Sequence, residues 1–183
     1  VCIGNSRAIQ YQLSGKAPWN LSYTDGAVNY TINNLQNSNN SLSVSPTTTT
    51  IYRITNLIDS NLCGINLSLN ANALKDTIKV NRLPIPNFNV STIRCEKNEV
   101  VFADQSTADL DAVSDRYWIM GNGNILNLLN GNPFTQVFPN WGKDTVKLAV
   151  KSSFGCLSDT LTRIIDIYPL PLVGFKIPFF CLN

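Results

Sequence analysis

Residues 145–156 read TVKLAVKSSFGC, a run in which apolar and polar side chains alternate and which ends in a glycine and a cysteine. Such alternation is typical of a β-strand with one buried face, and the Ser-Ser-Phe-Gly segment after it is typical of a turn. Residues 50–63, TIYRITNLIDSNLC, have the same order of alternating run, polar turn and cysteine. We therefore predict that Cys63 and Cys156 each lie in a hairpin between two strands.

The spacing of the cysteines shows that these two stretches belong to an internal repeat. From Cys2 to Cys63 is 61 positions, and from Cys95 to Cys156 is again 61 positions. The equal intervals predict two disulfides, Cys2–Cys63 and Cys95–Cys156, each closing one small domain. Cys181 follows a proline-containing segment like the one before Cys95, so we expect it to begin a third, truncated repeat and to remain unpaired.

The cysteines allow two other interpretations, a zinc site and free buried thiols. Zinc sites usually contain closely spaced ligand pairs, whereas no C-x-x-C pair occurs here and the members of each expected pair are 61 residues apart. Free buried cysteines in a cytosolic protein are the simpler alternative, but they do not predict equal intervals.

Short alternating runs recur along the whole chain, separated by turns rich in Gly, Pro, Asn and Ser. This texture predicts an all-β protein built of β-sandwiches. Proline pairs at Pro84/Pro86 and Pro169/Pro171 follow the last run of each repeat and mark stiff boundaries. We expect an immunoglobulin-like β-sandwich at 1–83, a second β-sandwich at 84–168, and a linker with the start of a third repeat at 169–183. Between Thr107 and Arg116 we expect a loop with at most one short helix.

Composition narrows the function. The 183 residues include no His, 14 Lys and Arg, and 12 Asp and Glu, giving a net charge of +2. Without His, Ser–His and Cys–His nucleophile pairs are excluded, and no paired-carboxylate motif replaces them, so we expect no enzymatic activity and no cofactor. The balanced charge does not favour nucleic acid. No stretch approaches the roughly 20 apolar residues of a membrane helix, so we expect no membrane insertion.

Three segments of the second repeat resemble the polycystic-kidney-disease-type (PKD) domain, an immunoglobulin-like sandwich. They are residues 100–106, VVFADQS; residues 118–123, WIMGNG; and residues 146–150, VKLAV. The resemblance implies a sandwich at 84–168. Met120 and Asn122 stand where the family has Phe and Asp, and Asn122 lacks the charge that cation binding at this loop would use.

The first repeat resembles the immunoglobulin-like modules of very large secreted proteins of the Bacteroidota, at residues 15–26, GKAPWNLSYTDG, and 46–52, PTTTTIY. Such proteins end in gliding-motility-associated or type IX secretion sorting domains. The resemblance implies a surface or secreted protein exported through the periplasm. The partners that it implies are neighbouring repeats of the same chain, and surface polysaccharide or the secretion or motility machinery.

Three tripeptides resemble the acceptor of a Bacteroidota protein O-glycosylation system. They place the acceptor hydroxyl at Thr77, Thr145 and Thr160, each after an Asp. Asp-Thr is also ordinary turn chemistry, which is the alternative interpretation.

Two further candidate sites stand out. Asp109, Asp111 and Asp115, with Asp104 upstream, are spaced as oxygen ligands for calcium, although acidic loops are usually only solvated. Trp141 lies in a turn, either exposed for stacking on a sugar or a partner, or capping the core. Trp19 and Trp118 lie in alternating runs and are predicted to be core.

Two classes of function remain. In the first the repeats are a stiff spacer and adhesive surface of a secreted or cell-surface protein. In the second they are carbohydrate-binding accessory modules of a large polysaccharide-degrading enzyme. An aromatic platform separates them, because sugar rings stack on aromatic faces. Trp141 alone makes a weak platform, which favours the spacer and adhesin.

Overall fold

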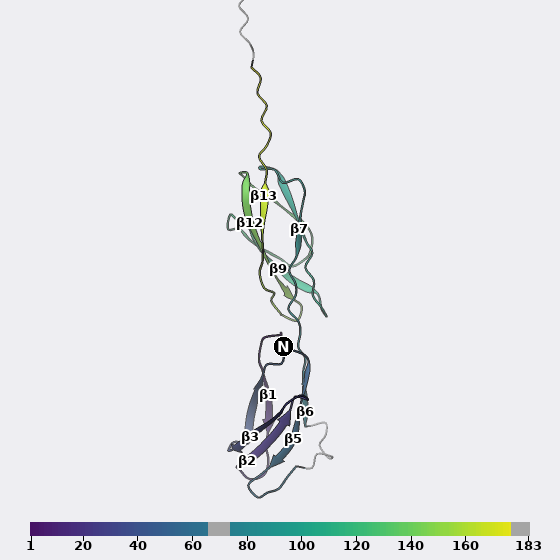
Figure 1. Cartoon of the computed structure of the whole chain (residues 1–183), viewed down its shortest axis with the longest axis vertical. Coiled ribbons are helices and arrows are strands. Elements are labelled where there is room, and N and C mark those ends of the chain that lie inside the picture. The colour runs from purple at the N-terminus through teal and green to yellow at the C-terminus, as the bar shows by residue number, and fades with distance from the viewer. Residues whose placement is uncertain (66–73, 177–183) are drawn as a thin grey trace, which may run out of the picture. The chain divides into compact units, whose positions relative to one another are not determined.

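The computed structural model describes residues 1–65 and 74–176, and within these ranges the chain contains strands and no helix (Figure 1). The prediction of an all-β, sandwich-forming chain is confirmed. Contacts divide the chain into two compact units. The first unit is Val1–Leu83 with Phe154–Cys156, and the second is Pro84–Ser153 with Leu157–Asn183.

The first sandwich consists of two antiparallel sheets. A two-stranded sheet pairs β1 (Arg7–Gln12) with β4 (Asn39–Val44). The other sheet has the order β3-β2-β5-β6, with β2 (Trp19–Thr24), β3 (Asn29–Leu35), β5 (Thr50–Ile58) and β6 (Lys75–Ile78). The buried side chains in the described part of this sandwich include Leu13, Trp19, Leu21, Val44 and Ile78.

The second sandwich also consists of two antiparallel sheets. One has the order β10-β9-β12-β13, with β9 (Val113–Ile119), β10 (Ile125–Leu128), β12 (Gly142–Ser152) and β13 (Leu161–Ile167). The other has the order β11-β8-β7, with β7 (Phe88–Val90), β8 (Glu99–Asp104) and β11 (Phe134–Val137). The segment before β9 contains no helix, only an isolated bridge between Ile85 and Thr107.

Alternation along β12 explains how this core forms. Val146, Leu148 and Val150 are fully buried, while Lys147 between them is exposed. Burying one such side chain contributes roughly 1.5–3 kcal/mol. Trp118 packs edge-on against Phe88 at 5.0 Å between ring centroids. The prediction that Trp19 and Trp118 belong to the core is confirmed, since they are 4% and 1% exposed.

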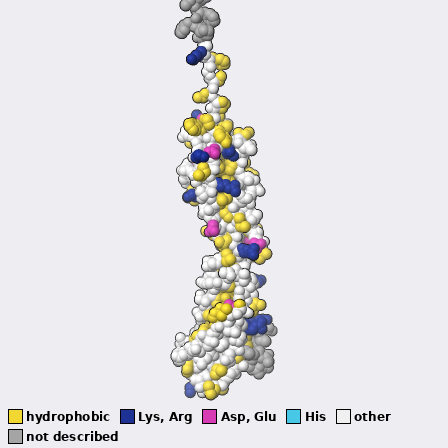
Figure 2. All heavy atoms as spheres, in the orientation of Figure 1, with side chains coloured by type: hydrophobic (Ala, Val, Ile, Leu, Met, Phe, Trp, Pro, Cys, Tyr) yellow, Lys and Arg dark blue, Asp and Glu magenta, His cyan; other side chains and the backbone are white. Residues whose placement is uncertain are grey.

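Charged side chains stand in small separate groups on the face drawn in Figure 2. Most of the surface between them carries uncharged side chains and backbone. Among the described residues, no helix has the length and apolar character needed to cross a membrane.

The structure corrects the predicted disulfide pairing. Cys2 is bonded to Cys156, with 5.5 Å between their Cα atoms, while Cys63 and Cys95 carry free thiols. Cys181 lies outside the described residues. The hairpin position of the two late cysteines is confirmed, since Cys63 lies between β5 and β6 and Cys156 between β12 and β13.

Strand geometry explains why the equal cysteine intervals predicted the wrong disulfide pairing. Cys2 forms a bridge with Asn81, which follows β6, and the end of β6 pairs with the start of β5. β5 is nine residues long, and Cys63 follows its other end. A strand rises about 3.3 Å per residue, so the two cysteines lie at opposite ends of the sandwich, far beyond the roughly 4.4–6.8 Å between Cα atoms that a disulfide spans.

Candidate functional site

The β2–β3 hairpin of the first sandwich brings two tyrosines together around one carboxylate. Tyr23 and Tyr30 are direct partners in the register of the two strands, and their rings stack at 4.9 Å with 15° between planes. Asp25 fixes the turn between them, because its Oδ1 accepts hydrogen bonds from the backbone N–H groups of Ala27 at 2.9 Å and Val28 at 2.7 Å. Its other oxygen, Oδ2, accepts a hydrogen bond of 3.0 Å from the Tyr30 hydroxyl.

These residues line a hollow of about 530 Å³, which we call the tyrosine hollow. Tyr52 of β5 contributes a third ring. The lining also includes hydroxyl side chains from the end of β4 to the start of β5, which are Ser43, Ser45, Thr47, Thr48 and Thr50, and the apolar residues Ala27, Val44 and Pro46. The volume lies within the roughly 300–1,000 Å³ that is usual for small-ligand sites.

Local interactions fix the protonation state of the carboxylate and the phenols that line the hollow. Hydrogen bonds from the backbone of Val28 and Ala27 hold the pKa of Asp25 below its ordinary value, so it remains a carboxylate acceptor. The hydrogen bond to Asp25 raises the pKa of Tyr30, and partial burial, followed by the charge of Asp25, raises the pKa of Tyr23 and of Tyr52. The three phenols are therefore neutral at pH 7.

This combination of groups suits the binding of neutral polar rings. Aromatic faces accept the C–H faces of a sugar, while hydroxyls and a carboxylate form hydrogen bonds with its hydroxyl groups. Tyr30 is 37% exposed, so part of its ring is open to a ligand.

Trp141, the aromatic residue singled out from the sequence, is 65% exposed and precedes β12. Its backbone N–H donates to Oε2 of Glu96 at 3.2 Å. The alternative interpretation, that its indole caps the core, is therefore wrong. Trp141 remains open to a partner.

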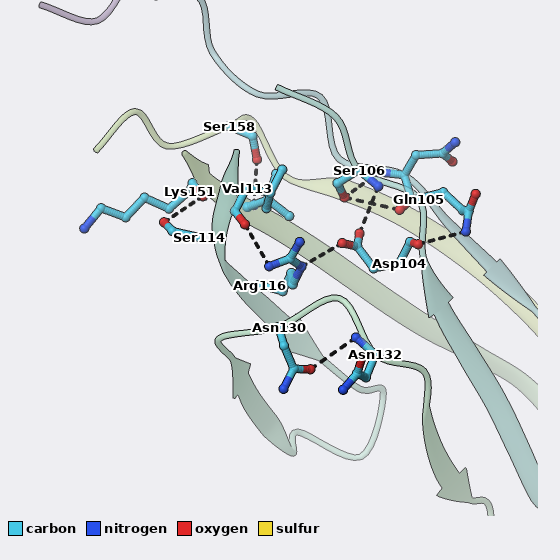
Figure 3. Close-up of polar contacts among 12 residues, drawn as sticks. Asp104, Gln105, Ser106, Val113, Ser114, Arg116, Asn130, Asn132, Lys151 and Ser158 are labelled. Atoms are coloured by element: carbon cyan, nitrogen blue, oxygen red, sulfur yellow. Dashed lines mark hydrogen bonds and ion pairs between the residues drawn. The ribbon is translucent and has the colours of Figure 1, made fainter. Parts of the chain in front are cut away.

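The four carboxylates proposed for calcium are not brought together. Asp104 Oδ2 is bonded to Nε of Arg116 at 2.7 Å (Figure 3), and Oδ1 accepts the Ser106 N–H at 2.9 Å. Asp115 accepts from the Ser114 hydroxyl and Asp111 from that of Ser153. Within the described ranges no group of three or more acidic or cysteine side chains is placed to hold a metal ion, which corrects the calcium hypothesis for Asp104, Asp109, Asp111 and Asp115.

The three candidate acceptor threonines differ in their surroundings. Thr77 in β6 and Thr160 just before β13 are exposed, whereas Thr145 in β12 is half-buried. The preceding aspartates have structural roles at two of the sites. Asp76 accepts a hydrogen bond from the Thr77 N–H at 2.8 Å, and Asp144 accepts one from the Gly121 N–H at 2.9 Å. Glycosylation of these threonines stays a prediction.

Reasoning from the sequence missed the tyrosine hollow. The signal was the Asp25-Gly26 turn, because a tight hairpin there places Tyr23 opposite Tyr30. Tyr52 joins them only through the pairing of β2 with β5, which the sequence does not reveal.

Comparison with known proteins gives likenesses of structure only. No protein family and no curated protein matches the sequence. The PKD1 domain of Vibrio anguillarum Epp is 22% identical, with a TM-score of 0.42, over 49% of this chain and 99% of that one. The fibronectin(III)-like modules of Clostridium thermocellum CbhA are 8% identical, with a TM-score of 0.43, over 96% of this chain and 93% of theirs.

A third solved structure comes from work on the promiscuous specificity of carbohydrate-binding modules of the β-sandwich superfamily. It is 24% identical to this chain, with a TM-score of 0.45, over 49% of this chain and 36% of that one. At these identities and TM-scores none of the three likenesses says what this chain binds or does.

Proposed function

We propose that the chain is a non-catalytic repeat segment of a secreted or cell-surface protein, acting as spacer and adhesive surface, with the tyrosine hollow as its contact site for carbohydrate. The observation that carries the proposal is the stack of Tyr23 on Tyr30 with Asp25 bonded to the Tyr30 hydroxyl. A sugar ligand uses both parts of this arrangement, the aromatic face and the hydrogen-bonding rim.

The extracellular assignment is supported by the disulfide between Cys2 and Cys156, because such bonds persist in oxidising compartments. Export through the periplasm by a type IX secretion route, with a role in gliding motility, is the finer form of the proposal. It is supported by the resemblance of residues 15–26 and 46–52 to Bacteroidota surface modules.

The second candidate is an accessory module that holds a polysaccharide-degrading enzyme on its substrate. The tyrosine hollow fits this candidate as well as the first, because carbohydrate is the ligand in both cases. The two candidates differ in the domains of the parent protein: further repeats favour adhesion, and a glycosidase domain favours the accessory module.

The binding test uses the whole chain on a glycan array and in affinity electrophoresis with soluble polysaccharides. Tyr30→Ala is expected to abolish binding, since it removes the most exposed ring of the hollow. Tyr30→Phe keeps the ring and loses the hydrogen bond to Asp25. One hydrogen bond contributes about 1.4 kcal/mol, which corresponds to a factor of roughly ten in affinity, so binding is expected to weaken by that factor.

Trp141→Ala is the matched control, because it removes an exposed aromatic residue that does not line the hollow. Binding should be unchanged in this variant. Binding lost in Trp141→Ala and kept in Tyr30→Ala would move the site to the second sandwich. Absence of any glycan binding would contradict the carbohydrate site and leave only the role of spacer.

A further inference from the structure

The bonded Cys2 and the free Cys95 occupy equivalent positions in the two sandwiches. Cys2 forms a parallel bridge with Asn81, flanked by a 2.9 Å bond from the Ile3 N–H to the Asn81 carbonyl and a 2.8 Å bond from the Asn81 N–H to the Val1 carbonyl.

Cys95 repeats this arrangement in the second sandwich. It forms a parallel bridge with Tyr168, flanked by a 2.9 Å bond from the Glu96 N–H to the Tyr168 carbonyl and a 2.7 Å bond from the Tyr168 N–H to the Arg94 carbonyl. Asn81 and Tyr168 each follow the last strand of their sandwich. We call Cys2 and Cys95 the bridge cysteines.

The bonded Cys156 and the free Cys63 are equivalent in the same way. The residue after Cys63, Gly64, pairs with Ile58 at the end of β5, and the next N–H bonds to the Leu57 carbonyl at 3.1 Å.

In the second sandwich the residue after Cys156, Leu157, pairs with Lys151 near the end of β12, and the next N–H bonds to the Val150 carbonyl at 2.8 Å. We call Cys63 and Cys156 the hairpin cysteines. Each type of position thus occurs once bonded and once free.

The one disulfide of the described residues therefore joins the bridge cysteine of one repeat to the hairpin cysteine of the repeat that follows it. The hairpin residues 154–156 also group by contacts with the first unit. Strand length excludes a bond between the two cysteines of one sandwich. The nine residues of β5 separate Cys63 from the end of the sandwich that holds Cys2, and the seven residues of β13 separate Cys156 from Tyr168, the bridge partner of Cys95.

We propose that the free cysteines take part in the same type of bond with neighbouring repeats: Cys95 with the hairpin cysteine of a following sandwich, and Cys63 with the bridge cysteine of a preceding one. Consecutive repeats are then linked to one another by disulfides, and no repeat is closed by a disulfide between its own two cysteines. This rests on the proposed function in so far as the chain is a repeat segment of a secreted protein, but it does not depend on the proposed sugar binding.

The exposure of Cys63 supports the proposal. Its thiol lies on the surface, and a thiol left over in an extracellular protein points to pairing with another partner. The chemistry needs a disulfide oxidant: two protein thiols and one glutathione disulfide give one protein disulfide and two molecules of reduced glutathione.

The test duplicates residues 82–168 in tandem within the full chain, so that the new copy follows Tyr168 as Arg82 follows Asn81. Cys95 then gains a following hairpin cysteine in the relation that Cys2 has to Cys156. In the new copy, Cys95→Ser removes the second bridge cysteine. Asp159→Glu, at an exposed position, makes the copy's Cys156 peptide heavier by one methylene group.

After refolding in a glutathione redox buffer, unreduced peptides are mapped by mass spectrometry. We expect the Cys95 peptide bonded to the heavier Cys156 peptide, the Cys2 peptide bonded to the lighter one, and loss of Cys95 alkylation by iodoacetamide. The Cys2 bond in the same digest shows that the first two repeats have folded.

A matched control carries Cys156→Ser in the copy, and Cys95 is then expected to be alkylated again. Cys95 bonded to the lighter Cys156 peptide would restore closure within one sandwich and overturn the proposal. So would a Cys95 that stays alkylated while the Cys2 bond forms, or absence of the Cys2–Cys156 bond from the unduplicated chain.

Discussion

Arg116 Nε donates to Asp104 Oδ2 at 2.7 Å, and the two side chains are only 11% and 7% exposed. The ion pair ties β9 to the end of β8, and so joins the two sheets of the second sandwich (Figure 3). A second guanidinium nitrogen of Arg116 donates to the Val113 carbonyl at 3.0 Å. Because both ions are largely removed from water, each depends on the other.

Asp104→Asn should therefore destabilise the second sandwich strongly. It leaves the Arg116 charge without its counter-ion, and breaking a buried pair from one side costs about 3–5 kcal/mol. Urea unfolding followed by tryptophan fluorescence, in a Trp19→Phe, Trp141→Phe background so that only the buried Trp118 reports, measures the free energy of unfolding. An Arg116→Met, Asp104→Leu double variant should be closer to the native chain than Asp104→Asn is, since no unpaired charge remains.

The same pair makes stability depend on pH. Burial raises the pKa of Asp104, but hydrogen bonds from Ser106 and Arg116 and the charge of Arg116 outweigh it, so the folded pKa lies below the ordinary value. A lowered pKa stabilises the fold above the unfolded pKa of about 3.9, and the gain is lost as the pH falls through the folded value. The stability difference between native chain and Asp104→Asn should shrink below about pH 4; a constant difference would contradict the ion pair.

Trp118 gives a test of the core. Its indole Nε1 is buried and has no hydrogen-bond acceptor among the described residues, while its ring contacts Phe88, Phe102 and Phe134. Trp118→Ala is expected to cost about 3–5 kcal/mol. Trp118→Phe should cost clearly less, because it keeps an aromatic ring and removes the unsatisfied donor. Calorimetric melting compares the two variants, and equal losses would contradict this expectation.

The strands and the core were predictable because they depend on local alternation. Val146, Leu148 and Val150 alternate with polar or small neighbours, and that pattern fixes which face is buried. The repeat was predictable for a similar reason, since the cysteine interval records equivalent positions in two folded units.

The disulfide pairing and the tyrosine hollow depend on contacts between distant segments. The equal interval says that Cys63 and Cys156 are equivalent, but not which cysteine each meets; the length of β5 decides that. Likewise Asp104 is acidic in the sequence, but only the fold places Arg116 beside it and removes it from the calcium hypothesis.

Gly121 and Asp144 form a coupled pair at the turn after β9. The Gly121 N–H bonds to Asp144 Oδ1, and a Cβ atom added to Gly121 would lie 2.2 Å from that oxygen. Gly121→Ala should therefore push the carboxylate away and destabilise the sandwich. In an Asp144→Ala background the same change should cost less, with a coupling on the order of 1 kcal/mol in a double-mutant cycle of thermal unfolding. Additive losses would contradict the contact.

The Cys2–Cys156 bond makes a prediction about the chain under tension. The bond spans a sequence separation of 154 residues, so in the oxidised protein pulled from its two ends this segment cannot extend. Extended chain covers at most about 3.6 Å per residue, and reduction should therefore lengthen the fully unfolded molecule by on the order of 500 Å.

Single-molecule pulling with and without dithiothreitol measures this gain, and Cys2→Ser should unfold to the long contour under both conditions. Closure of each sandwich by its own disulfide would instead give two separate gains of about 200 Å, one for each 61-residue interval. The size of the step thus distinguishes a bond between repeats from bonds within them, because the length released equals the length of chain that the disulfide encloses.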